Sequence, residues 1–229
     1  MRLINLFFLL IFSQSILALN LNPWAQQSKI FSIMLDPAGD AKTPGRVIDD
    51  TFERGVTLQF AESLKKELES RYPQIRVVLS RFAGESLEPL QNASFANRLE
   101  VDLFLNINLF FKKDDVSKIF LYQFVSNPVT DFWQKDWSEL CFQPYDQAHL
   151  KNINVTKNWG QKFRLSLEKE SRNQRFVFKG FYGLPFKPLV GILAPALALE
   201  IGISKQKGWQ DYVSVVCNSL HPIIFEALL

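Results

Sequence analysis

The chain has 229 residues, of which 47% are apolar and 21% are charged, and this composition excludes a disordered or multi-span membrane protein. The length suffices for one sizeable domain with a buried core. The formal net charge of +3 comes from Lys and Arg spread along the sequence, so it gives only weak grounds for nucleic-acid binding and would equally suit an anionic cell-surface polymer.

Residues 1–18 have the pattern of a secretory signal peptide. Arg2 precedes the apolar run LINLFFLLIF, and the small residues of SQSILA follow it. This run is too short to span a bilayer comfortably. We therefore expect export to the periplasm, the cell envelope or the exterior, with cleavage between about Ser15 and Asn20 and membrane contact only through this segment. An uncleaved N-terminal anchor is the alternative.

Strand and helix patterns alternate from residue 29 onward. Short apolar runs predict the strands, and in 52–73 apolar residues recur at four-residue steps between Lys and Glu, which predicts an amphipathic helix. The predicted strands are 29–36, 75–81, 101–111, 117–125, 189–193 and 195–203. The predicted helices are 52–73, the end of 86–99, 155–169, and 209–229 with a kink at Pro222.

This alternation predicts an α/β fold. Strands joined through helices of this length need crossover connections, which favour a mostly parallel sheet. We expect a single domain, residues 29–229, with a mostly parallel central sheet flanked by helices on both faces. Residues 127–154 show poorer periodicity and aromatic-rich patches, and we interpret them as an insertion or lid.

Two cysteines, Cys141 and Cys217, remain in the exported portion of the chain. In an oxidising compartment they can pair, and as isolated thiols they can equally be buried apolar residues. Both interpretations stay open. Two thiols are too few for a Cys-rich zinc site.

Four sequence phrases occur in an order that is similar to a known family. They are LDPAGDAKTPG, FERGVTLQFAESL, DLFLNINLF and PALALEIGIS, with VVLSR and FANRLEVDLFL between them. Their order and intervals resemble the zinc-dependent N-acetylmuramoyl-L-alanine amidases (amidase type 3 fold), which cut the bond between the lactyl group of the cell-wall glycan and the stem peptide. The resemblance runs from about Lys29 to the C-terminus.

The resemblance implies a zinc site that this chain lacks in part. In the family a first-loop His, a helix-opening Glu and a third-strand His hold the metal, and a late-strand Glu acts on the metal-bound water. The Glu ligand falls on Glu53 and the catalytic Glu on Glu200, whereas the two His positions are occupied by Gly39 and Asn108. Glycine offers no donor, and an amide oxygen is a weak ligand beside imidazole. We therefore predict that zinc is not bound and that Glu200 is a remnant of the old site.

A relocated metal site is the competing interpretation. Asp36 and Asp40 flank the first lost histidine position, and a site of Asp40, Glu53 and His149 is conceivable. Asp after Gly is also ordinary turn chemistry. If the cleft geometry is retained, histidines placed at 39 and 108 should create a zinc site with Glu53.

Glu200 lies within the apolar strand ALALEIGI, where an unpaired carboxylate is costly to bury. We expect its side chain to point into the cleft, either protonated or paired with Lys42, Arg54 or Arg81. Arg81 follows VVLS, has a family counterpart, and is expected to be a structural ion-pair partner. The aromatic segments DFWQKDW and FKGFYGLPF can line a sugar-binding or partner-binding groove, or can serve packing.

Three functions follow from these residues. The leading hypothesis is an exported amidase-like protein that has lost zinc-dependent hydrolysis and acts as a peptidoglycan-binding or regulatory pseudoenzyme. The second is an active cell-wall amidase with a relocated metal site. The third is a structural envelope module that binds another envelope protein through residues 127–154. The expected ligands are peptidoglycan or its fragments, not nucleic acid.

Overall fold

The computed structural model describes residues 30–229 except 89, 114–115, 126–143, 174–175 and 205. The predicted signal peptide, residues 1–18, and most of the predicted insertion lie outside the described residues. The described end of the insertion, Tyr145–Asn152, is the 3-10 helix η1, which leads into helix α4. None of the described helices has the length and hydropathy needed to cross a membrane.

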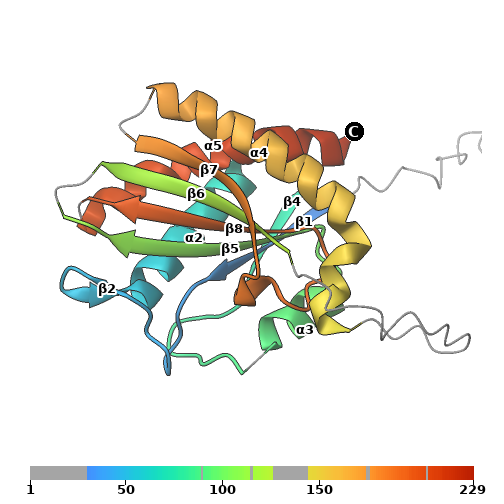
Figure 1. Ribbon diagram of the computed structural model, residues 1–229, viewed down its shortest axis with the longest axis horizontal. Helices are drawn as coiled ribbons and strands as arrows, with labels where there is room; N and C mark the ends of the chain where they lie inside the picture. The colour runs from blue at the N-terminus through green and yellow to red at the C-terminus, as the bar shows by residue number, and fades with distance from the viewer. Residues whose placement is uncertain (1–29, 89, 114–115, 126–143, 174–175, 205) are drawn as a thin grey trace, which may run out of the picture.

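A six-stranded sheet forms the centre of the domain (Figure 1). Its strand order is β4-β1-β5-β8-β6-β7, and every neighbouring pair is parallel except β6 and β8. The strands are β1 (Phe31–Pro37), β4 (Ile75–Leu79), β5 (Leu103–Phe111), β6 (Ser117–Phe124), β7 (Phe176–Leu184) and β8 (Ala196–Ile203). The central strands are almost wholly buried, as expected for parallel strands covered on both faces.

Helices cover both faces of this sheet, so the predicted α/β fold is confirmed (Figure 1). Three long helices pack on one face through the larger apolar core: α2 (Glu53–Arg71), α4 (Ile153–Asn173) and α5 (Asp211–Leu228). The other face is covered by the short helix α3 (Gln91–Arg98) and the 3-10 helix η2 (Lys187–Leu189), which enclose a smaller apolar cluster. Part of this second face therefore remains for polar side chains.

Strand alternation places the polar side chains on that second face. In β5, residues 103, 105, 107 and 109 are Leu or Ile and lie in the larger core. The intervening residues include Asn106 and Asn108, so both amides lie on the opposite face. The same alternation in β8 directs Leu199 and Ile201 into the core and Glu200 to the other side.

Two segments differ from the sequence-based expectation. Residues 189–193 were expected to be a strand, but Leu189 ends η2 and Gly191 adopts a left-handed φ of +81° in the following turn. The apolar side chains of Leu189 and Ile192 are still buried, in the smaller cluster. The short hairpin of β2 (Val47–Ile48) and β3 (Thr51–Phe52) and the edge strand β7 were not expected.

Cys217 lies on α5 with no exposed surface, and burial raises the pKa of its thiol to about 11. A thiol in this environment is unreactive at neutral pH. Cys141 lies outside the described residues, so its pairing with Cys217 remains a prediction.

Candidate active site

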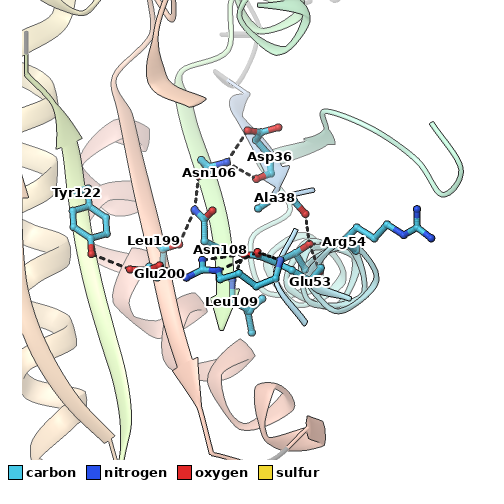
Figure 2. Close-up of polar contacts among 12 residues, drawn as sticks. Asp36, Ala38, Glu53, Arg54, Asn106, Asn108, Leu109, Tyr122, Leu199 and Glu200 are labelled. Atoms are coloured by element: carbon cyan, nitrogen blue, oxygen red, sulfur yellow. Dashed lines mark hydrogen bonds and ion pairs between the residues drawn. The ribbon is translucent and has the colours of Figure 1, made fainter. Parts of the chain in front are cut away.

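The two carboxylates of the predicted site lie close together where β5, β8 and the start of α2 meet. Figure 2 shows Glu53 and Glu200 facing each other across the end of β5, with Asn108 between their elements. Asn108 is the register partner of Glu200 in the neighbouring strand. The fold therefore brings Glu53, Asn108 and Glu200 together, and Gly39 lies against Arg54 at the start of the same helix α2.

Glu53 is the first residue of α2 and is only 4% exposed. Its Oε2 accepts hydrogen bonds from the backbone N of Arg46 at 3.0 Å and from Arg46 Nε at 3.1 Å. Its Oε1 accepts from Arg46 Nη2 at 3.1 Å and from the backbone N of Leu109 at 3.0 Å. Both carboxylate oxygens are thus engaged by Arg46.

Glu200 is held by the same arginine. Arg46 Nη1 donates to Glu200 Oε1 at 2.7 Å, and the Tyr122 hydroxyl donates to Glu200 Oε2 at 3.0 Å. Burial, and then the neighbouring charge of Glu200, raise the pKa of Tyr122. Neither Arg46 nor Tyr122 was among the predicted site residues, and Arg46 directly follows the Asp36-to-Gly45 loop in which the metal ligand was sought.

The three cations expected to pair with Glu200 have other partners, so that expectation was wrong. Lys42 forms an exposed ion pair with Glu88 at 2.8 Å. Arg54 Nη1 donates to the carbonyl of Ala41 at 3.1 Å. Arg81 is 3% exposed and donates to three backbone carbonyls at the end of β1 and the start of α2, those of Pro37, Ala38 and Arg54.

Asp36 belongs to a buried polar network at the end of β1 and does not face Glu53. Its Oδ1 accepts from Ser80 Oγ at 2.5 Å and its Oδ2 from Asn106 Nδ2 at 2.8 Å. Burial raises its pKa, and the hydrogen bonds from Ser80, Asn106 and Asn92 only partly oppose this. Asn106 Oδ1 in turn accepts from Asn108 Nδ2 at 2.5 Å, which fixes the orientation of the Asn108 amide (Figure 2).

The Asp40 side chain stabilises a turn by hydrogen bonds and is not part of a metal site. Its side chain accepts from the backbone N of Thr43 at 2.5 Å and of Leu87 at 3.0 Å. Burial acts to raise the pKa of Asp40, but these hydrogen bonds outweigh it and the pKa is lowered. His149 lies on η1, with its ring against Phe124 at a centroid distance of 4.8 Å. Asp40, Glu53 and His149 therefore do not form the relocated site.

Gly39 has a backbone that resists a side chain. Its φ is +76°, and a Cβ there would lie 2.9 Å from Arg54 Cβ. A side chain at position 39 would therefore be strained. That histidines at 39 and 108 complete a zinc site with Glu53 stays a prediction.

Gly39→Ala is expected to lower the free energy of unfolding by about 2 kcal/mol, because it adds a steric contact to left-handed strain. Gly84 has a similar φ of +83°, and a Cβ there would meet nothing within 4 Å, so Gly84→Ala is the matched control and should cost about 1 kcal/mol. Urea unfolding of both variants measures the difference. Equal losses would show that the contact with Arg54 relaxes without cost.

The residues present do not fit the zinc ion that the family resemblance implies. A catalytic zinc ion takes three protein ligands and keeps one position for water. Of the implied ligand positions only Glu53 carries a carboxylate, and both of its oxygens accept from Arg46. Within the described part of the chain, no three His, Cys, Asp or Glu side chains are gathered as a metal site.

Comparison with solved structures identifies the fold. The N-acetylmuramoyl-L-alanine amidase of Clostridium difficile 630 has a TM-score of 0.61 at 18% identity, covering 88% of this chain and 98% of that one. Ami1 of Mycobacterium smegmatis has a TM-score of 0.61 at 13% identity, covering 86% and 97%. The CwlD amidase of Clostridioides difficile, in complex with the GerS lipoprotein, has a TM-score of 0.58 at 14% identity, covering 86% and 99%.

At these identities the structural likeness establishes the fold alone. No curated protein matches the chain. The family model described as N-acetylmuramoyl-L-alanine amidase (Amidase_3) matches residues 33–210, which is more than half of the sequence. The chain therefore belongs to the N-acetylmuramoyl-L-alanine amidase family.

Proposed function

We propose that this chain is an exported amidase-fold protein that no longer hydrolyses the wall by zinc chemistry and instead binds peptidoglycan or regulates other envelope proteins. The observation that carries the proposal is the pairing of both acidic residues, Glu53 and Glu200, with Arg46. The Glu53 carboxylate accepts four hydrogen bonds, which use the lone pairs that a metal would need, and Arg46 also holds one oxygen of Glu200. Gly39 and Asn108 supply no imidazole in compensation.

Glu200 is also poorly placed for catalysis without a metal. A general base must reach the proton it takes, and both Glu200 oxygens accept hydrogen bonds, from Arg46 and from Tyr122. The site therefore supports binding better than turnover.

Wall binding is supported by aromatic side chains beside Glu200. Tyr122 lies against Phe120, Tyr182 and Phe186, with ring centroids 6.3, 6.1 and 5.4 Å away. Tyr182 is 45% exposed, so this aromatic cluster reaches the surface. Aromatic rings next to hydrogen-bonding groups are typical of small-molecule and sugar-sized binding sites. Part of the FKGFYGLPF segment thus fits the groove interpretation, whereas Phe178 and Phe181 pack against the larger core.

The test is metal content and wall hydrolysis of the purified protein. After incubation with zinc and desalting, we expect no stoichiometric zinc and no release of stem peptides from purified peptidoglycan. The protein should nevertheless co-sediment with insoluble peptidoglycan. A zinc-loaded active amidase of the same family is the positive control. Stoichiometric zinc together with stem-peptide release would overturn the proposal.

Matched variants locate the binding surface in the same sedimentation assay. Tyr182→Ala should reduce the bound fraction, because it removes the exposed ring of the aromatic cluster. Phe225 is a comparably exposed aromatic residue on α5, which packs on the other face of the sheet, so Phe225→Ala should leave binding unchanged. Unchanged binding of the Tyr182 variant would exclude this face as the wall-binding surface.

A further inference from the structure

The guanidinium of Arg46 forms ion pairs with both carboxylates of the site. Nε and Nη2 contact Glu53, and Nη1 contacts Glu200, with distances of 2.7 to 3.1 Å. The planar guanidinium presents several N–H donors in a fixed arrangement, which matches the geometry of a carboxylate far better than a lysine ammonium does. One residue thereby joins a loop after β1, the first turn of α2 and the middle of β8.

The conformation of the loop before Arg46 allows the close contact between this loop and Glu53. Gly45 has a φ of +79°, and a Cβ there would lie 2.8 Å from Glu53 Oε2, so only glycine fits this approach. The backbone N of Glu53 donates to the carbonyl of Arg46 at 2.8 Å, while the Arg46 N donates to Glu53 Oε2 at 3.0 Å. These reciprocal bonds fix the direction in which the arginine side chain leaves the loop.

The surroundings of the guanidinium suit an organic cation. The ring of Phe110 lies 5.3 Å from Arg46 Cζ, which is a cation–π distance. Burial acts to lower the pKa of Arg46, but the hydrogen bonds and charges of Glu53 and Glu200 outweigh it and the pKa is raised. The charge on this side chain is therefore permanent, and unlike a metal ion it cannot dissociate or activate a coordinated water.

We propose that Arg46 is a built-in substitute for a metal ion, and that Glu53 and Glu200 bind a divalent cation only when its side chain is removed. This inference deepens the proposed function, because it supplies the reason that zinc chemistry is absent. Without the guanidinium, two carboxylates would face one space with the Asn108 amide oxygen as the remaining nearby donor of the old ligand set. Oxygen donors of this kind suit hard cations such as Mn²⁺.

The test compares Arg46→Ala with the wild type in the presence and absence of Mn²⁺. We expect the variant to have a lower melting temperature and to recover most of the loss with millimolar Mn²⁺ or methylguanidinium. Electron paramagnetic resonance should show that the variant binds Mn²⁺ about tenfold or more tightly than the wild type. The melting temperature of the wild type should not rise when Mn²⁺ is added. Arg76 is exposed on β4, so Arg76→Ala is the control and should show neither change.

Arg46→Lys separates charge from shape. It keeps one positive charge at the site, so it should remain folded, lose part of the stability and gain no Mn²⁺ binding. The inference is overturned if Arg46→Ala is as stable as the wild type, if neither ion restores it, or if wild type and variant bind Mn²⁺ equally. None of these measurements depends on wall hydrolysis. They can therefore refute the role of Arg46 without refuting the proposed function, which zinc-dependent turnover would overturn.

Discussion

Glu53→Ala is expected to lower the free energy of unfolding by about 3 kcal/mol. The change leaves the backbone N of Leu109 without its buried acceptor and removes the carboxylate that holds both the backbone and the side chain of Arg46. The partial exposure of Arg46 keeps the loss below that of a fully buried pair, because the guanidinium can turn toward water. Urea unfolding followed by circular dichroism measures the effect.

The sign of this effect distinguishes the arginine-filled site from an ordinary metal-ligand site. In a metal-free ligand cluster, removing one carboxylate relieves repulsion and does not destabilise the protein. The control is Glu62→Ala, an exposed glutamate on the same helix, which should change stability little. Combining Glu53→Ala with Arg46→Ala should cost less than the sum of the two single changes, because each single change leaves the other partner unpaired. A stable Glu53→Ala protein would contradict the pairing.

Arg81→Met is expected to destabilise the protein by about 3 kcal/mol, although Arg81 lies outside the pair of carboxylates. Its guanidinium satisfies the carbonyls of Pro37, Ala38 and Arg54, with distances of 2.9 to 3.1 Å. Methionine retains the packing volume but donates nothing, so three carbonyls at the junction of β1 and α2 lose a charged donor.

The control for this change is Arg76→Met, an exposed arginine on β4, which should be close to neutral. Thermal and urea unfolding of the two variants give the comparison. Equal stability of both would mean that water replaces the Arg81 hydrogen bonds without loss. Burial lowers the pKa of Arg81, yet the charge persists at neutral pH, so the expected loss is the same across the neutral range.

Much of the fold was predictable because its central strands carry continuous apolar runs. The runs of β1, β5 and β8 are bounded by polar or turn residues, and the four-residue spacing of α2 is regular over its whole length. Residues 189–193 have an equally apolar run but lie between Pro188 and Pro195, and the chain buries them as a turn. Apolar content alone does not distinguish the two cases.

Strand β7 was missed for the opposite reason. It lies at the edge of the sheet with a burial pattern that alternates irregularly, and it contains two glycines, Gly180 and Gly183. Glycine within an apolar segment lowers the strand propensity, and the register with β6 is interrupted near Phe120. The pairing of β7 with β6 therefore stabilises this strand more than its own strand propensity does.

The positions of Glu53 and Glu200 were predictable, whereas their common partner was not. Glu200 and Arg46 are 154 residues apart in the chain, and nothing in the residues around either one indicates the other. Lys42, Arg54 and Arg81 were equally plausible cations before the loop conformation was known. The turn at Gly45 decides among them, since it directs Arg46 and not its neighbours toward the carboxylates.

The left-handed turn at Gly39 also limits how such a protein changes over evolutionary time. A histidine at 39 alone strains the backbone, a histidine at 108 alone meets a carboxylate already held by arginine, and loss of Arg46 alone exposes two like charges to each other. Each of these single changes is therefore expected to lower stability. Under the proposed function, zinc-dependent hydrolysis could return to this chain only through less stable intermediates.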